Sequence, residues 1–85
     1  MLRIDTVTGV GTTRILRLEG EVVGPWVDAL GRSCDAELSA HDGVILDLQN
    51  VVFVDRDGVA LFHRLVQAGA VVVNGSAFIR SQIGV

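Results

Sequence analysis

Apolar and polar residues alternate at the start of this 85-residue chain. Residues 2–7 follow a period of two, which predicts a strand with one buried face. A glycine-containing turn at residues 9–11 comes next. Residues 14–22 then alternate again, with Leu16 and Leu18 on one side. Two such strands joined by a short turn predict an antiparallel hairpin.

Residues 24–40 change to the spacing of a helix. Pro25 suits a first helical position, where its missing N–H costs no hydrogen bond. The apolar residues then recur every three or four positions, which predicts one buried stripe. This stripe consists of Val27, Leu30, Cys34 and Leu38.

Two apolar runs follow, at residues 44–48 and 51–54. The first is typical of an interior parallel strand, and the second either extends it or descends beside it. Helical spacing returns from Arg56 or Asp57 to about Ala68. The predicted buried side of this helix consists of Val59, Phe62, Leu65, Val66 and Gly69.

The chain closes with a short strand and a short helix. Residues 70–73 are apolar and follow a glycine that ends the preceding helix. Ser76 is suited to cap a last helix, whose inner face we predict to contain Phe78, Ile79 and Ile83. The predicted order is β-β-α-β-α-β-α. It indicates a single small α/β domain in which an N-terminal antiparallel hairpin joins a mainly parallel sheet with right-handed crossovers.

The triplet Asp55-Arg56-Asp57 interrupts this apolar pattern between a strand and a helix. Open α/β sheets place their ligand sites at the carboxyl ends of their strands. An acidic side chain at a helix start can also cap unpaired N–H groups. The triplet therefore indicates either a binding site or a cap formed by one of its acids, with Arg56 in solvent.

Composition narrows the possible functions. The net charge is −3, and all seven basic residues are scattered arginines, which argues against nucleic-acid binding. The absence of lysine excludes Schiff-base chemistry and a phosphate-loop lysine. No apolar run has the length of a membrane span, and no signal peptide is evident. We therefore expect a cytoplasmic protein without membrane insertion.

Cysteine and histidine indicate no cofactor or metal. The single Cys34 fits a reducing compartment and the core. The histidines, His41 and His63, lie far apart, so no metal-ligand spacing exists. Trp26, near the start of the first helix, is either a core residue or an exposed anchor for a partner.

Two stretches of the chain resemble STAS domains, the family of sulphate transporters and anti-sigma-factor antagonists. The stretch "VILDLQNVVFVDRDGVALFHRL" is similar to the family's signature region, in which an apolar strand leads to Asp-Ser-Ser-Gly or Asp-Ser-Thr-Gly before a helix. The stretch "ILRLEGEV" looks like the family's second strand. The resemblance covers about residues 12–83.

The resemblance implies a switchable, non-enzymatic module that binds another protein. Its implied partner is an anti-sigma-factor-like kinase or another regulatory protein. Alternatives are an accessory STAS subunit that binds the ATPase of a lipid or anion transporter, and a nucleotide-binding regulatory domain. Together with the triplet, it predicts a partner-binding surface formed by Asp55, Arg56, Asp57, Gly58, Phe62 and Trp26.

Asp57 departs from the family pattern. It occupies the place where antagonists carry the phosphorylated serine, so the usual phosphoswitch is not expected. Its carboxylate either resembles the phosphorylated state in part or simply caps the helix, and we favour the cap. The chain also stops at Val85, before the last strand and helix of typical members. Residues 1–85 are therefore expected to be a short variant or a cut sequence, and an uncovered edge would favour a homodimer or another partner.

Overall fold

The computed structural model of the chain describes residues 1–9 and 11–84 and confirms the predicted order of elements. The hairpin is formed by β1 (Leu2–Thr8) and β2 (Thr13–Val22). The alternating part consists of α1 (Pro25–Ala40), β3 (Gly43–Val54), α2 (Arg56–Gln67), β4 (Val71–Val73) and α3 (Ala77–Ile83).

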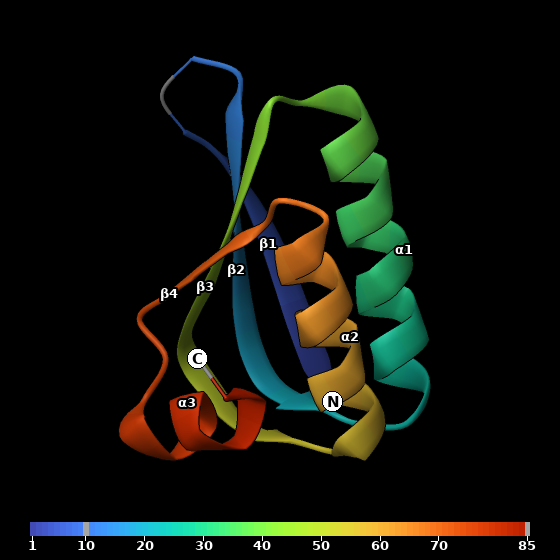
Figure 1. Cartoon of the computed structure of the whole chain (residues 1–85), viewed down its shortest axis with the longest axis vertical. Helices are drawn as coiled ribbons and strands as arrows, with labels where there is room; N and C mark the ends of the chain where they lie inside the picture. The colour runs from blue at the N-terminus through green and yellow to red at the C-terminus, as the bar shows by residue number, and fades with distance from the viewer. Residues whose placement is uncertain (10, 85) are drawn as a thin grey trace.

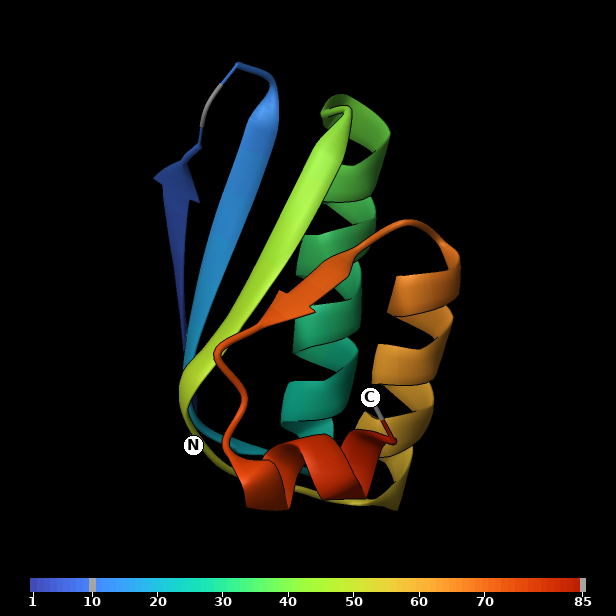
Figure 2. The same cartoon turned by 60° about the vertical axis from the view of Figure 1, so that its left-hand side comes forward.

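The four strands form one mixed sheet in the order β1-β2-β3-β4. β1 is antiparallel to β2, whereas β2, β3 and β4 run parallel to one another. Helices α1 and α2 lie side by side against one face of this sheet, and α3 crosses its lower end (Figures 1 and 2). The predicted α/β arrangement, a hairpin joined to a mainly parallel sheet, is therefore confirmed.

The core lies between the sheet and the helices. Leu16 and Leu46 are paired on neighbouring strands and are fully buried. The helices supply Leu30 and Cys34 from α1 and Leu65 from α2, each with no exposed surface. The apolar residues that recur at every second position in the strands therefore pack against those that recur at every third or fourth position in the helices.

The apolar run at residues 51–54 extends β3 and does not form a separate strand. The pairing of β2 with β3 shifts register twice, between Arg17 and Glu19 and between Gly20 and Glu21. Such irregularities change which side chains face the core. Val51 and Val54 are buried, whereas Val52 and Phe53 are 63% and 39% exposed.

Two predicted helix ends are confirmed, and three predicted core contacts, those of Val66, Gly69 and Phe78, are wrong. Pro25 begins α1, and Ser76 caps α3 by accepting a hydrogen bond of 3.1 Å from the N–H of Ile79. However, Gly69 lies beyond the end of α2 and is exposed. Phe78 is 57% exposed and Val66 is 38% exposed. Phe78 directly precedes the buried Ile79, and neighbouring helical residues point about 100° apart.

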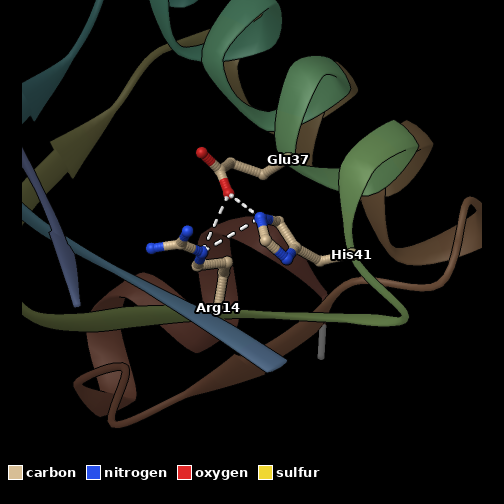
Figure 3. Close-up of polar contacts among 3 residues, drawn as sticks. All are labelled: Arg14, Glu37 and His41. Atoms are coloured by element: carbon tan, nitrogen blue, oxygen red, sulfur yellow. Dashed lines mark hydrogen bonds and ion pairs between the residues drawn. The ribbon is translucent and has the colours of Figure 1, made fainter. Parts of the chain in front are cut away.

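Three polar side chains attach the end of α1 to β2 at the amino ends of the parallel strands (Figure 3). Arg14 on β2 donates from Nε to Nε2 of His41 at 3.0 Å. Glu37 lies in the last turn of α1, and its Oε2 atom is 3.7 Å from Arg14 Nε and 3.3 Å from His41 Nε2. His41 therefore takes part in a structural contact.

Cys34 gives a direct test of the core. Burial, together with the nearby charge of Asp35, raises the pKa of its thiol to about 12, so the reactive thiolate is scarce at neutral pH. We expect the native chain to react with a thiol reagent such as DTNB only at the rate of unfolding, and the denatured chain to react at once. Rapid labelling of a chain with native circular dichroism would contradict this packing.

Candidate functional site

The carboxylate of Asp55 joins two loops at the carboxyl ends of β2 and β3. Its Oδ1 accepts a hydrogen bond of 2.8 Å from the N–H of Gly58, and its Oδ2 accepts one of 3.0 Å from the N–H of Gly24. The N–H of Asp55 itself donates to the carbonyl oxygen of Val22 at 3.1 Å. One residue therefore caps α2 and also holds the connection between β2 and α1.

These hydrogen bonds favour the charged form of Asp55. The N–H of Gly24 and then that of Gly58 lower the pKa of the carboxyl group below its ordinary value. Of the two acids in the triplet, Asp55 is thus the one that caps the helix, and the favoured interpretation of Asp57 as the cap is wrong. Asp57 lies in the first turn of α2, where its negative charge suits the helix dipole.

Gly58 allows α2 to start directly against the strand ends. A Cβ atom at this position would lie 2.6 Å from Cγ1 of Val54 and 2.8 Å from the carbonyl oxygen of Val22. Only a residue without a side chain fits this approach. Gly58 is itself buried, so the prediction that it contacts a partner is wrong, and its role is to position the loop.

The prediction that Phe62 binds a partner is also wrong. Phe62 has no exposed surface and is one of the largest fully buried side chains. It lies four residues after Gly58, so both occupy the face of α2 that packs against the sheet. The hydrophobic pattern places Phe62 in the core, and the family resemblance did not distinguish core residues from surface residues.

The other predicted residues lie at the same edge of the sheet and are exposed. Arg56 and Asp57 occupy the first turn of α2. Trp26 occupies the first turn of α1 and is 38% exposed. The bond between Gly24 and Asp55 ties these two helix starts together. The starts of α1 and α2 lie at the same end of the sheet in Figure 1.

Helix α3 lies at this edge as well. The side chain of Gln82 bonds both backbone groups of Val54, at 3.3 Å to the N–H and 3.2 Å to the carbonyl oxygen. Phe78, in the first turn of α3, and Phe53, near the end of β3, add exposed aromatic area that the sequence analysis missed. We call the exposed side chains at this edge the carboxyl-edge surface: Trp26, Val52, Phe53, Arg56, Asp57 and Phe78.

The carboxyl-edge surface combines exposed apolar and aromatic side chains with two exposed charged ones. Within residues 1–9 and 11–84, no hydrogen bond or salt bridge engages the side chains of Arg56 and Asp57. The same residues contain no group of three His, Cys, Asp or Glu side chains arranged for a metal ion. In the described part of the chain, no helix has the length and apolar character needed to span a bilayer.

Comparison with solved structures identifies the fold. The chain matches the anti-sigma factor antagonist SpoIIAA in its unphosphorylated form with a TM-score of 0.75 and 21% identity, over 96% of this chain and 78% of that one. The phosphorylated form of the Bacillus cell fate determinant SpoIIAA gives 0.74 and 20%, over 96% and 86%. An antisigma-factor antagonist STAS domain from Rhodobacter sphaeroides gives 0.57 and 17%, over 86% of each chain.

The chain has the STAS fold. This confirms the fold that the sequence resemblance implies. No protein-family model and no curated protein matches the chain by sequence. The two forms of SpoIIAA match almost equally well. The similarity of the fold therefore does not depend on which phosphorylation state of SpoIIAA is compared.

Replacement of Asp55 by asparagine tests the cap. The folded pKa of Asp55 is lowered, so its stabilising contribution is complete above the unfolded pKa and is lost as pH falls through the folded pKa. The amide of asparagine keeps one acceptor oxygen for the cap but replaces the other by an NH2 donor, so the bond from Gly24 is lost. At pH 7 we therefore expect Asp55→Asn to lower the midpoint of thermal unfolding by about 5 °C. Below pH 4 the difference between the variant and the wild type should shrink.

Asp57→Asn is the matched control, because it removes the same charge two residues away without removing the cap. Thermal unfolding followed by circular dichroism at several pH values measures both variants. Equal losses in the two variants, or a loss for Asp55→Asn that does not change with pH, would contradict the assignment of the cap.

Gly58→Ala tests the close approach of α2 to the strands. The added methyl group would overlap the backbone of Val22, which cannot move without disturbing β2. We expect a loss of about 1–3 kcal/mol in the free energy of unfolding, measured by urea denaturation. Gly69→Ala is not a suitable control, since the φ of Gly69 is 109°. Ala60→Gly, on the exposed side of the same helix, should cost only about 1 kcal/mol.

Proposed function

We propose that the chain is a non-enzymatic regulatory module that binds a protein partner through the carboxyl-edge surface. The observation that carries this proposal is the double hydrogen bonding of Asp55, which brings the exposed starts of α1 and α2 to one corner. Its partner is an anti-sigma-factor-like kinase or another regulatory protein of the cytoplasm. The likeness to anti-sigma-factor antagonists supports this class of partner.

The composition of the surface supports protein binding. Trp26, Phe53 and Phe78 expose aromatic area at the edge of the sheet where Arg56 and Asp57 are also exposed. Aromatic residues and arginine are the types that contribute most to protein–protein affinity. In the proposed complex Trp26 and Arg56 are the main contacts, and Gly58 and Phe62 hold the surface from beneath.

Asp57 gives the module a permanent charge. Asp55 forms the cap, so the carboxylate of Asp57 is free to face a partner. A carboxylate has one negative charge, whereas a phosphoserine carries nearly two. A phosphatase can remove the phosphate of a phosphoserine but not a carboxylate. We propose that the affinity for the partner is therefore set by this fixed charge and not by a phosphorylation cycle at this position.

Two double variants with the same change in composition test the surface. Arg56→Ala with Asp57→Ala removes one base and one acid from the carboxyl-edge surface. Arg32→Ala with Asp42→Ala removes the same pair from exposed positions on α1 and on the α1–β3 connection. Neither change alters the net charge. Quantitative mass spectrometry of proteins captured from the native host compares both variants with the wild type.

We expect the Arg56–Asp57 double variant to lose a specific partner that the Arg32–Asp42 double variant retains. With that partner purified, Trp26→Ala should weaken binding by at least about tenfold in calorimetry. Equal capture of the partner by both double variants, each with a native thermal unfolding transition, would show that the carboxyl-edge surface does not bind it. An unchanged affinity of the Trp26→Ala variant for the partner would show that Trp26 is not a main contact.

A further inference from the structure

β1 leaves one edge of the sheet without a partner strand. It is the first strand of the sheet order and, among the described residues, pairs only with β2. In Figure 2 it stands at the side of the sheet farthest from α2. It is seven residues long and contains no proline, lysine or bulge, so it lacks several of the features by which proteins commonly block an exposed edge.

The hydrogen bonds to β2 determine which backbone groups face outward. The N–H of Gly9 donates to Thr13, and the carbonyl oxygen of Met1 accepts from Glu21. Hydrogen-bonded pairs alternate along an antiparallel ladder, so the odd-numbered residues of β1 bond to β2. The N–H and carbonyl groups of the even-numbered residues therefore point to the free edge. These residues are Leu2, Ile4, Thr6 and Thr8.

The side chains of Arg3 and Asp5 stand together on the sheet face opposite the helices. Their side chains are 66% and 53% exposed, and Arg3 Nε lies 3.2 Å from Asp5 Oδ2. Between them, Ile4 points to the other face, where it is partly buried against the core. A base and an acid thus flank Ile4 symmetrically on a free edge.

We propose that β1 pairs with β1 of a second copy of this chain, antiparallel and about a two-fold axis at Ile4. In this register Ile4 faces Ile4 of the second copy as a hydrogen-bonded pair. Arg3 then faces Asp5 of the second copy in a non-hydrogen-bonded pair, where cross-strand side chains are closest. The two-fold axis produces this contact twice.

Charge selects this register over its neighbours. Only registers that pair even-numbered residues satisfy the outward backbone groups. A shift of the second copy by two residues one way places Asp5 against Asp5, and a shift the other way places Arg3 against Arg3. Like charges directly opposite one another are destabilising, so opposite charges meet only when the axis passes through Ile4.

The other edge of the sheet does not offer an equal alternative. β4 has only three residues, Val71–Val73, and pairs with Ile45 to Asp47 in the first half of β3. A contact between β1 and β4 of another copy would be heterologous and would build a ring or an open filament, not a two-fold dimer. Pairing through β1 closes after two copies and makes one continuous sheet.

Pairing through β1 leaves both carboxyl-edge surfaces free. In each copy that surface lies at one end of the sheet, beside the starts of α1 and α2 (Figure 1). Because the paired β1 strands run antiparallel, the two surfaces point to opposite ends of the joined sheet. The dimer is thus a bivalent module. This inference does not depend on the proposed function, since the β1 edge and the carboxyl-edge surface are separate.

Charge reversal tests the register through sedimentation velocity. We expect the wild type to dimerise reversibly between about 10 µM and 1 mM, because a two-strand interface is small. Arg3→Asp alone and Asp5→Arg alone should each weaken dimerisation by at least about tenfold. An equimolar mixture of these two variants should form a heterodimer, because every facing pair then has opposite charges. This rescue cannot arise from contacts within one chain.

Thr6→Pro provides an independent block of the same edge. The N–H of Thr6 points outward, so proline removes a bond of the dimer without removing one to β2. We expect a folded monomer. Three results would each overturn the proposal: a wild type that stays monomeric at about 1 mM, single charge variants that dimerise as well as the wild type, or a mixture that does not associate. A folded Thr6→Pro dimer would also overturn it.

Discussion

The carboxylate of Asp55 is the interaction on which the candidate site depends. It accepts hydrogen bonds from Gly24 and Gly58, which belong to different loops. Each loop leads from a parallel strand into a helix, so one side chain sets the start of α1 relative to the start of α2. The lowered pKa of Asp55 follows from the same two N–H groups, and links the geometry of the loops to their electrostatics.

The rest of the fold makes this interaction possible. β2 and β3 are parallel neighbours, so their carboxyl ends meet at one edge. Gly58 allows α2 to begin against that edge, where a methyl group would overlap the backbone of Val22. At the opposite end, the contact of Arg14 with His41 and Glu37 holds the end of α1 to β2. Helix α1 is thus fixed to the sheet by polar contacts at both ends.

The periodicity of the sequence predicted the order of the elements and much of the core, because these depend on neighbours along the chain. It did not decide which acid of the triplet caps α2, since the second bond of Asp55 comes from Gly24, far away in sequence. It also missed the exposure of Val52 and Phe53, which follows two register shifts between β2 and β3. Phe62 was assigned to the surface by resemblance, although its helical position indicated the core.

A pH titration of the amide signals of Gly24 and Gly58 by two-dimensional NMR tests the central claim most directly. If one carboxylate accepts hydrogen bonds from both groups, both amide protons should shift with a single apparent pKa below the ordinary range of aspartate. In the Asp55→Asn variant both transitions should vanish. Two different apparent pKa values, or an amide of Gly24 that does not respond to pH, would contradict the account.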